Sequence, residues 1–212
     1  MKNFTLMVAG ILLLSACHSK PKDAHSSQAS DDEVSTQEAK KSEAPAASFS
    51  SADYDTLFSA ALDHQVDLVQ KKIKQGLDLN KTDEAGRTAL MLAAFNGHTD
   101  IVKMLMASGA DCRKLDVNNR SALMFACTGP FLETVKVLIE EGAEVNGMDS
   151  HENWTPVMFA ASEGQLEVVK YLIEVGADIS MVDIDGESSY DFALSRGHTA
   201  TAEYLKQMAQ KQ

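Results

Sequence analysis

The stretch GRTALMLAA at residues 86–94 decides the fold, because the chain repeats it at a nearly constant spacing. It returns after 33 residues as NRSALMFAC at 119–127, after a further 34 as NWTPVMFAA at 153–161, and after 33 more as GESSYDFAL at 186–194. An earlier and weaker copy begins with DTLFSAA at 55–61 and closes with GLDLN at 76–80. Five copies at one period predict a solenoid in which each unit packs on its neighbours.

Each copy predicts two helices joined by a turn and followed by a loop. Hydroxyl residues stand at the start of the first helix, where they can accept an unpaired backbone N–H; these N-caps are Thr88, Ser121, Thr155 and Ser188. Pro156 falls at the first helical position, where its missing N–H costs nothing. Glycines end the second helices in the left-handed conformation, at Gly76, Gly109, Gly142 and Gly176.

This layout resembles the ankyrin repeat. TALM at 88–91 and TPVM at 155–158 stand where that family has T-P-L-H, and Gly97-His98 and Gly197-His198 match its G-H turn. The resemblance implies an all-α solenoid over residues 53–212, with helix pairs joined by β-hairpin-like loops. It divides that domain into about five repeats: an N-terminal cap at 53–81, three full repeats at 82–181 and a C-terminal cap at 182–212.

The chain departs from the family pattern at several positions. Met91, Met124, Met158 and Asp191 replace the family's histidine, so we expect thioether packing in place of its hydrogen bond in the three full repeats. Pro130 replaces a turn glycine and cannot be left-handed, so we expect Gly129 to take the positive φ. One extra residue before Trp154 predicts a protruding loop at 148–152. We expect His98 and His198 to form hydrogen bonds at a helix start.

The first residues are typical of an export signal. A short basic start, Met1 to Asn3, precedes the apolar run Phe4–Leu14, which is too short to cross a bilayer. LSAC at 14–17 resembles the lipobox of bacterial lipoproteins, which implies a signal peptide at 1–16 that is removed and a lipid on Cys17. In that family an aspartate after the cysteine favours the inner membrane, so the resemblance implies that His18 directs the protein to the outer membrane of a Gram-negative cell, facing the periplasm or exposed on the cell surface. An ordinary signal peptide with a chance cysteine is the alternative.

Residues 17–52 are predicted to form a disordered tether, because Ser and Ala make up 16 of the 35 residues after Cys17. The whole chain has 19 Lys and Arg against 31 Asp and Glu, which argues against a nucleic-acid binder. Residues 121–212 hold 5 basic and 15 acidic side chains, whereas 51–120 hold 9 and 10. This asymmetry favours a partner with a basic patch, or serves solubility alone.

No catalytic, phosphate-binding or zinc-binding motif stands out, so we expect no enzymatic activity, cofactor, metal or small-molecule substrate. Two alternatives involve sulfur chemistry. The in-register methionines at 91, 124 and 158 are either core residues or a sink for oxidants in the envelope. Cys112 and Cys127 are either buried thiols or a disulfide, if their Cα atoms lie within about 7 Å.

The family resemblance implies a protein partner, bound by a concave face made of loop tips and the exposed side of each first helix. The residues predicted to form it are Arg87, Phe95, Asn96, Arg120, His151, Glu152, Trp154, Glu163, Glu187 and Arg196. Trp154 is the chain's only tryptophan, and Trp and Arg are enriched at binding hot spots. The alternative has Trp154 half-packed on its own loop. The prediction is a monomeric, non-enzymatic interaction module tethered to the envelope, or a surface factor acting on a host protein.

Overall fold

A computed structural model describes residues 48–211. The predicted signal peptide, Cys17 and nearly all of the predicted tether lie outside these residues. The first helix of each repeat is α1 (Ser51–Leu62), α3 (Ala89–Phe95), α5 (Ala122–Cys127), α7 (Pro156–Ser162) or α9 (Ser189–Ser195). The second helix is α2 (Val66–Lys74), α4 (Thr99–Ala107), α6 (Leu132–Glu140), α8 (Leu166–Glu174) or α10 (Thr199–Ala209). The predicted all-helical solenoid is confirmed.

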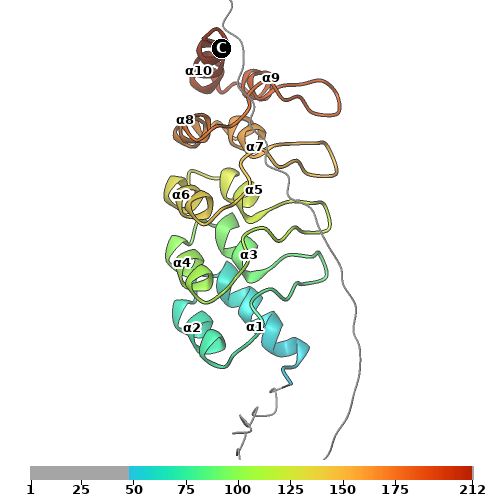
Figure 1. Cartoon of the computed structure of the whole chain (residues 1–212), viewed down its shortest axis with the longest axis vertical. Coiled ribbons are helices and arrows are strands. Elements are labelled where there is room, and N and C mark those ends of the chain that lie inside the picture. Colours follow the sequence, from blue (N-terminus) through green and yellow to red (C-terminus); the bar gives the residue numbers. More distant parts are fainter. Residues whose placement is uncertain (1–47, 212) are drawn as a thin grey trace, which may run out of the picture. The chain divides into compact units, whose positions relative to one another are not determined.

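The helices stack in two columns, with the second helices on one side and the first helices beside the loops (Figure 1). Small and branched apolar residues fill the space between them; Leu90, Leu123, Val157 and Leu172 are almost completely buried. Neighbouring loops are joined by backbone hydrogen bonds, from Val117 N–H to the Ala85 carbonyl at 3.1 Å and from Ser150 N–H to the Asn118 carbonyl at 2.8 Å. We call the surface formed by the first helices and these loops the loop-side face.

All four predicted N-cap residues precede their helices, but the Thr155 hydroxyl has no hydrogen-bond partner among the described residues, and the methionines do more than pack. The hydroxyls of Thr88, Ser121 and Ser188 each accept the backbone N–H three residues on. In return, the Sδ atoms of Met91 and Met158 each lie 3.4 Å from the N-cap N–H and accept it. The prediction that packing replaces the family's hydrogen bond was therefore incomplete, since sulfur serves as the acceptor in two of the three full repeats.

The turn between α5 and α6 is built differently from the prediction. Gly97, Gly164 and Gly197 have positive φ, as expected, but among the described residues with positive φ neither Pro130 nor Gly129 is found. The prediction for Gly129 was wrong. Glycine at position 129 instead leaves room for the ring of Phe131, which a Cβ there would overlap.

His98 and His198 also differ from the prediction. Neither side chain caps its own helix. Each Nε2 instead lies within hydrogen-bond distance of a carbonyl in the preceding repeat: Leu62 at 2.9 Å for His98 and Ser162 at 3.0 Å for His198. These two histidines therefore join successive repeats.

The repeat domain begins slightly before the predicted boundary at residue 53. Ser50 precedes α1, and its backbone N–H and hydroxyl both donate to the Asp53 carboxylate, at 3.1 and 2.8 Å. Phe49 meets the edge of the Tyr54 ring, with 6.5 Å between ring centroids. Within residues 48–211, none of the helices has the length and apolar character needed to span a bilayer.

Candidate functional site

A line of aromatic side chains follows the loop-side face. Phe125, Phe159 and Phe192 each lie four residues after an N-cap, so the repeat brings them into one column. Phe95 belongs to α3 and meets Phe125 edge to face, with 6.2 Å between centroids. Phe95 is 46% exposed, Phe125 and Phe159 are half-buried, and Phe192 is buried. With Trp154, these residues form what we call the aromatic face.

Trp154 is the centre of the later part of this face. Its ring centroid lies 5.2 Å from that of Phe159 and 4.3 Å from that of Phe192. The Arg196 guanidinium lies 5.9 Å from the indole centroid. The side chain is half-buried, and its Nε1 has no hydrogen-bond partner within the described chain although that atom is buried. Buried indole N–H groups are normally paired, so the described residues leave this donor unsatisfied.

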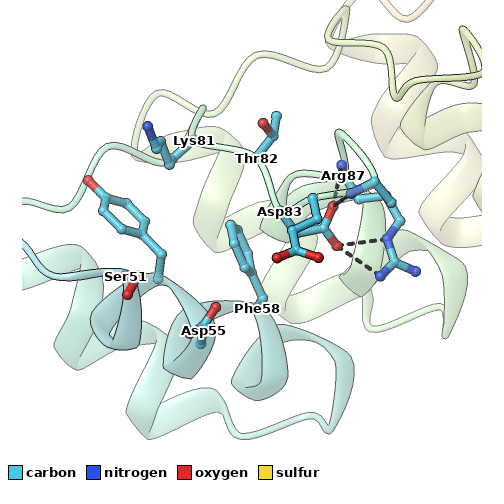
Figure 2. A pocket seen from close by; sticks show the side chains of 10 residues that line it. Ser51, Asp55, Phe58, Lys81, Thr82, Asp83 and Arg87 are labelled. Carbon is cyan, nitrogen blue, oxygen red and sulfur yellow. Dashed lines mark hydrogen bonds and ion pairs between the residues drawn. The ribbon is translucent and has the colours of Figure 1, made fainter.

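An aspartate anchors each loop by accepting backbone N–H groups. In the second repeat, Asp83 Oδ1 accepts from the N–H groups of Ala85 and Arg87, and Asp83 Oδ2 pairs with the Arg87 guanidinium at 2.8 Å. Both residues line a cavity of about 670 Å³ beside Phe58. Figure 2 shows the pair among the side chains that line this cavity. The third repeat copies the arrangement with Asp116 and Arg120, whose Nη2 lies 2.8 Å from Asp116 Oδ2. The two predicted arginines are therefore held by their own loops.

The fourth and fifth repeats keep the aspartate and lose the arginine. Asp149 Oδ1 accepts the N–H groups of Glu152 and Trp154, each at 3.0 Å, and Trp154 occupies the arginine's position. The extra residue of this loop lies in the turn between Asp149 and Trp154. Beside it is an open cavity of about 350 Å³, and the residues lining it are Asn118, Arg120, Asp149, His151, Glu152, Trp154 and Phe159.

The remaining predicted site residues have varied surroundings. Asn96 is exposed, but its Nδ2 donates to the Leu62 carbonyl at 2.8 Å and so ties α3 to the preceding repeat. His151 Nδ1 lies 2.9 Å from a Glu152 carboxylate oxygen. Arg196 lies 3.4 Å from Glu163, and Glu187 is exposed. All ten predicted residues lie on the loops, on the first helices or directly after them.

Three carboxylates approach one another at the ends of the last two loops. Oxygen atoms of Glu152, Asp183 and Asp185 lie within 4.8 Å of one another, close enough to share a cation. Asp183 is buried and its Oδ1 accepts two backbone N–H groups, whereas Asp185 is exposed. The cluster adds to the negative charge of the later repeats.

The two cysteines of the repeat domain and the three in-register methionines are buried in the repeat core. Cys112 and Cys127 are free thiols, so the disulfide alternative is wrong. Burial raises the pKa of both thiols and suppresses the reactive thiolate. Met91, Met124 and Met158 are at most 2% exposed, which supports a role in packing.

This burial predicts the outcome of oxidation. After brief peroxide treatment of the folded protein, mass spectrometry should find Met148, which is 46% exposed, converted to the sulfoxide first. Met91, Met124 and Met158 should react about tenfold or more slowly, because peroxide must reach them through local opening. Equal rates at all four methionines would instead favour the oxidant-sink alternative.

Several parts of this site were not predicted from the sequence. Phe125, Phe159 and Phe192 recur at the repeat spacing, as do Asp83, Asp116, Asp149 and Asp183, so both columns were visible in the aligned copies. The aligned copies also place Arg87 and Arg120 four residues after these aspartates, so their pairing could have been predicted in the same way. The unpaired Nε1 of Trp154 could not be found in this way, because it depends on how the indole packs against Phe159 and against Phe192 of the next repeat.

Comparisons with known proteins agree with the fold. The family model described as ankyrin repeats (3 copies) matches residues 57–149 and 131–212. No protein with a curated description matches the chain.

Proposed function

The chain belongs to the ankyrin-repeat family, whose members are generally modules for protein–protein interaction, and from this premise we propose that its loop-side face binds a protein partner at the bacterial envelope. The module has no reaction of its own in this proposal. The lipid on Cys17 holds it at the membrane, in the outer membrane facing the periplasm.

The aromatic face is the observation that carries the proposal. Exposed aromatic rings offer large contact areas at a small cost in conformational entropy, and they dominate interface energies. Phe95 is nearly half exposed, and two loop residues beside the face, Val117 and Ile184, are 65% exposed. Apolar groups gathered on one surface, with arginines and carboxylates around them, are typical of an interface core with a polar rim.

Photo-crosslinking in living cells tests the partner-binding part. A photoreactive phenylalanine analogue at residue 95 should give one discrete protein adduct after irradiation, because Phe95 lies on the proposed interface. The same analogue at Glu167, exposed on α8 in the other helix column, is the matched control and should give none. Equal adducts from both positions, or none from position 95, would contradict the proposed interface.

The anchor gives a separate prediction. Cys17→Ser removes the sulfur that lipid attachment requires, and stable anchoring of a soluble domain needs at least two acyl chains. We expect the variant to retain its signal peptide or to leave the membrane fraction, with lost partitioning into Triton X-114. A Cys17→Ser protein that stays membrane-bound and partitions as the unaltered chain does would refute the lipoprotein part alone.

A further inference from the structure

Within this chain, two repeats show what satisfies the second oxygen of the loop aspartate. Asp83 Oδ2 lies 2.8 Å from both Nε and Nη2 of Arg87, and Asp116 Oδ2 lies 2.9 and 2.8 Å from the same atoms of Arg120. Each is a two-pronged contact between a carboxylate oxygen and a guanidinium. Such charge-assisted contacts are stronger than neutral hydrogen bonds and fix the direction of approach.

The fourth repeat has the same carboxylate without the guanidinium. Asp149 is 7% exposed and its Oδ1 accepts two backbone N–H groups, but its Oδ2 has no partner among residues 48–211. Trp154 stands where the other repeats have arginine. Asp183 of the fifth repeat also lacks a guanidinium, but Asp149 lines the open cavity beside its loop, where its carboxylate can meet a cation from outside.

The surroundings of Asp149 suit a planar cation. Asp149 lines the 350 Å³ cavity together with the rings of Trp154 and Phe159, and a guanidinium can stack on such rings while its N–H groups reach the carboxylate. Glu152 adds a second carboxylate to the lining. Of the two basic residues there, Arg120 is neutralised by Asp116, and His151 lies against Glu152.

We propose that this cavity binds an arginine side chain of the protein partner. Its guanidinium pairs with the Asp149 carboxylate, as those of Arg87 and Arg120 pair with their own loop aspartates. The inference rests on the proposed function and names the chemistry by which that face recognises its partner. It also accounts for the acidic character of the later repeats, because a basic segment would be drawn toward them.

A peptide titration tests this inference directly. Trp154 is the only tryptophan and lines the cavity, so its fluorescence reports occupancy. The peptide acetyl-Gly-Arg-Gly-amide should change the emission of the full chain and saturate at about millimolar concentration. The citrulline peptide, which has the same shape without the charge, should bind about tenfold or more weakly. The lysine peptide should bind more weakly than the arginine peptide, since an ammonium lacks the planar fork.

Three variants locate the binding. Asp149→Asn keeps an oxygen for the two backbone N–H groups and removes the charge, so we expect about a tenfold loss of arginine-peptide binding. Asp183→Asn is the matched control, because Asp183 accepts the equivalent N–H groups in the next loop but does not line the cavity. Trp154→Arg supplies the internal guanidinium of the earlier repeats, so calorimetry should find no peptide binding in a folded protein.

Equal binding of the arginine and citrulline peptides would overturn the inference, as would unchanged arginine binding in a folded Asp149→Asn or Trp154→Arg protein. If these results came together with an intact crosslink from residue 95, the proposed interface would stand and only its recognition of arginine would be wrong. Loss of the crosslink at residue 95 would instead refute the proposed function.

Discussion

Replacing Trp154 with alanine should weaken partner binding by about 30- to 1,000-fold, since truncation of a central aromatic anchor costs about 2–4 kcal/mol. The indole also packs on Phe159 and Phe192, so the same change should lower the melting temperature by a few degrees, about 2–4 °C. Affinity is measured by titration of the partner isolated through the crosslink, and stability by circular dichroism.

Tyr171→Ala is the matched control for this variant. Tyr171 is a half-buried aromatic residue on α8, in the column of second helices. Its truncation should lower the melting temperature to a similar extent and leave the affinity unchanged. If Trp154→Ala destabilises the fold and binding persists at its original strength, Trp154 serves its own repeat and the site lies elsewhere.

Deleting residues 182–212 should produce the largest loss of stability. The deletion removes α9 and α10, and with them Phe192 against Trp154 and the contact of His198 with the Ser162 carbonyl. Solenoid stability is roughly a sum of repeat and interface terms, so the newly exposed α7 and α8 should lower the melting temperature by on the order of 10 °C or cause aggregation.

Removing only residues 210–212, which follow α10, is the control and should change little. A protein lacking 182–212 that remained monomeric and melted as before would show that the last two helices do not act as a cap.

Local and periodic signals made most of the fold predictable. Hydroxyl N-caps, Pro156 at the start of α7 and the glycines that end the second helices all act within one turn of the chain, so each can be read from a short segment. The repeated spacing then places every unit in the same relation to the next. For this reason the order and the pairing of the helices followed from the aligned copies.

The failures concern contacts that depend on how each turn or loop is built, and some of these contacts cross from one repeat to the next. His98 and His198 bond to carbonyls of the preceding repeat, and Gly129 is required by the ring of Phe131. The sequence does not show that each histidine will meet a carbonyl 36 positions earlier, nor that the turn after α5 will place the Phe131 ring against Gly129. The free oxygen of Asp149 belongs with these, since it depends on which side chain occupies the arginine's position and on how that side chain packs.

Hydrogen exchange of the protein alone and in complex with its crosslinked partner tests the central claim, that the loop-side face is the binding surface. We predict slower exchange, on partner binding, in the loops and first helices at 84–96, 117–128 and 150–163, with the strongest effect around Trp154. The second helices α4, α6 and α8 should exchange at unchanged rates. Protection confined to those second helices would contradict the claim and place the partner on the opposite side of the solenoid.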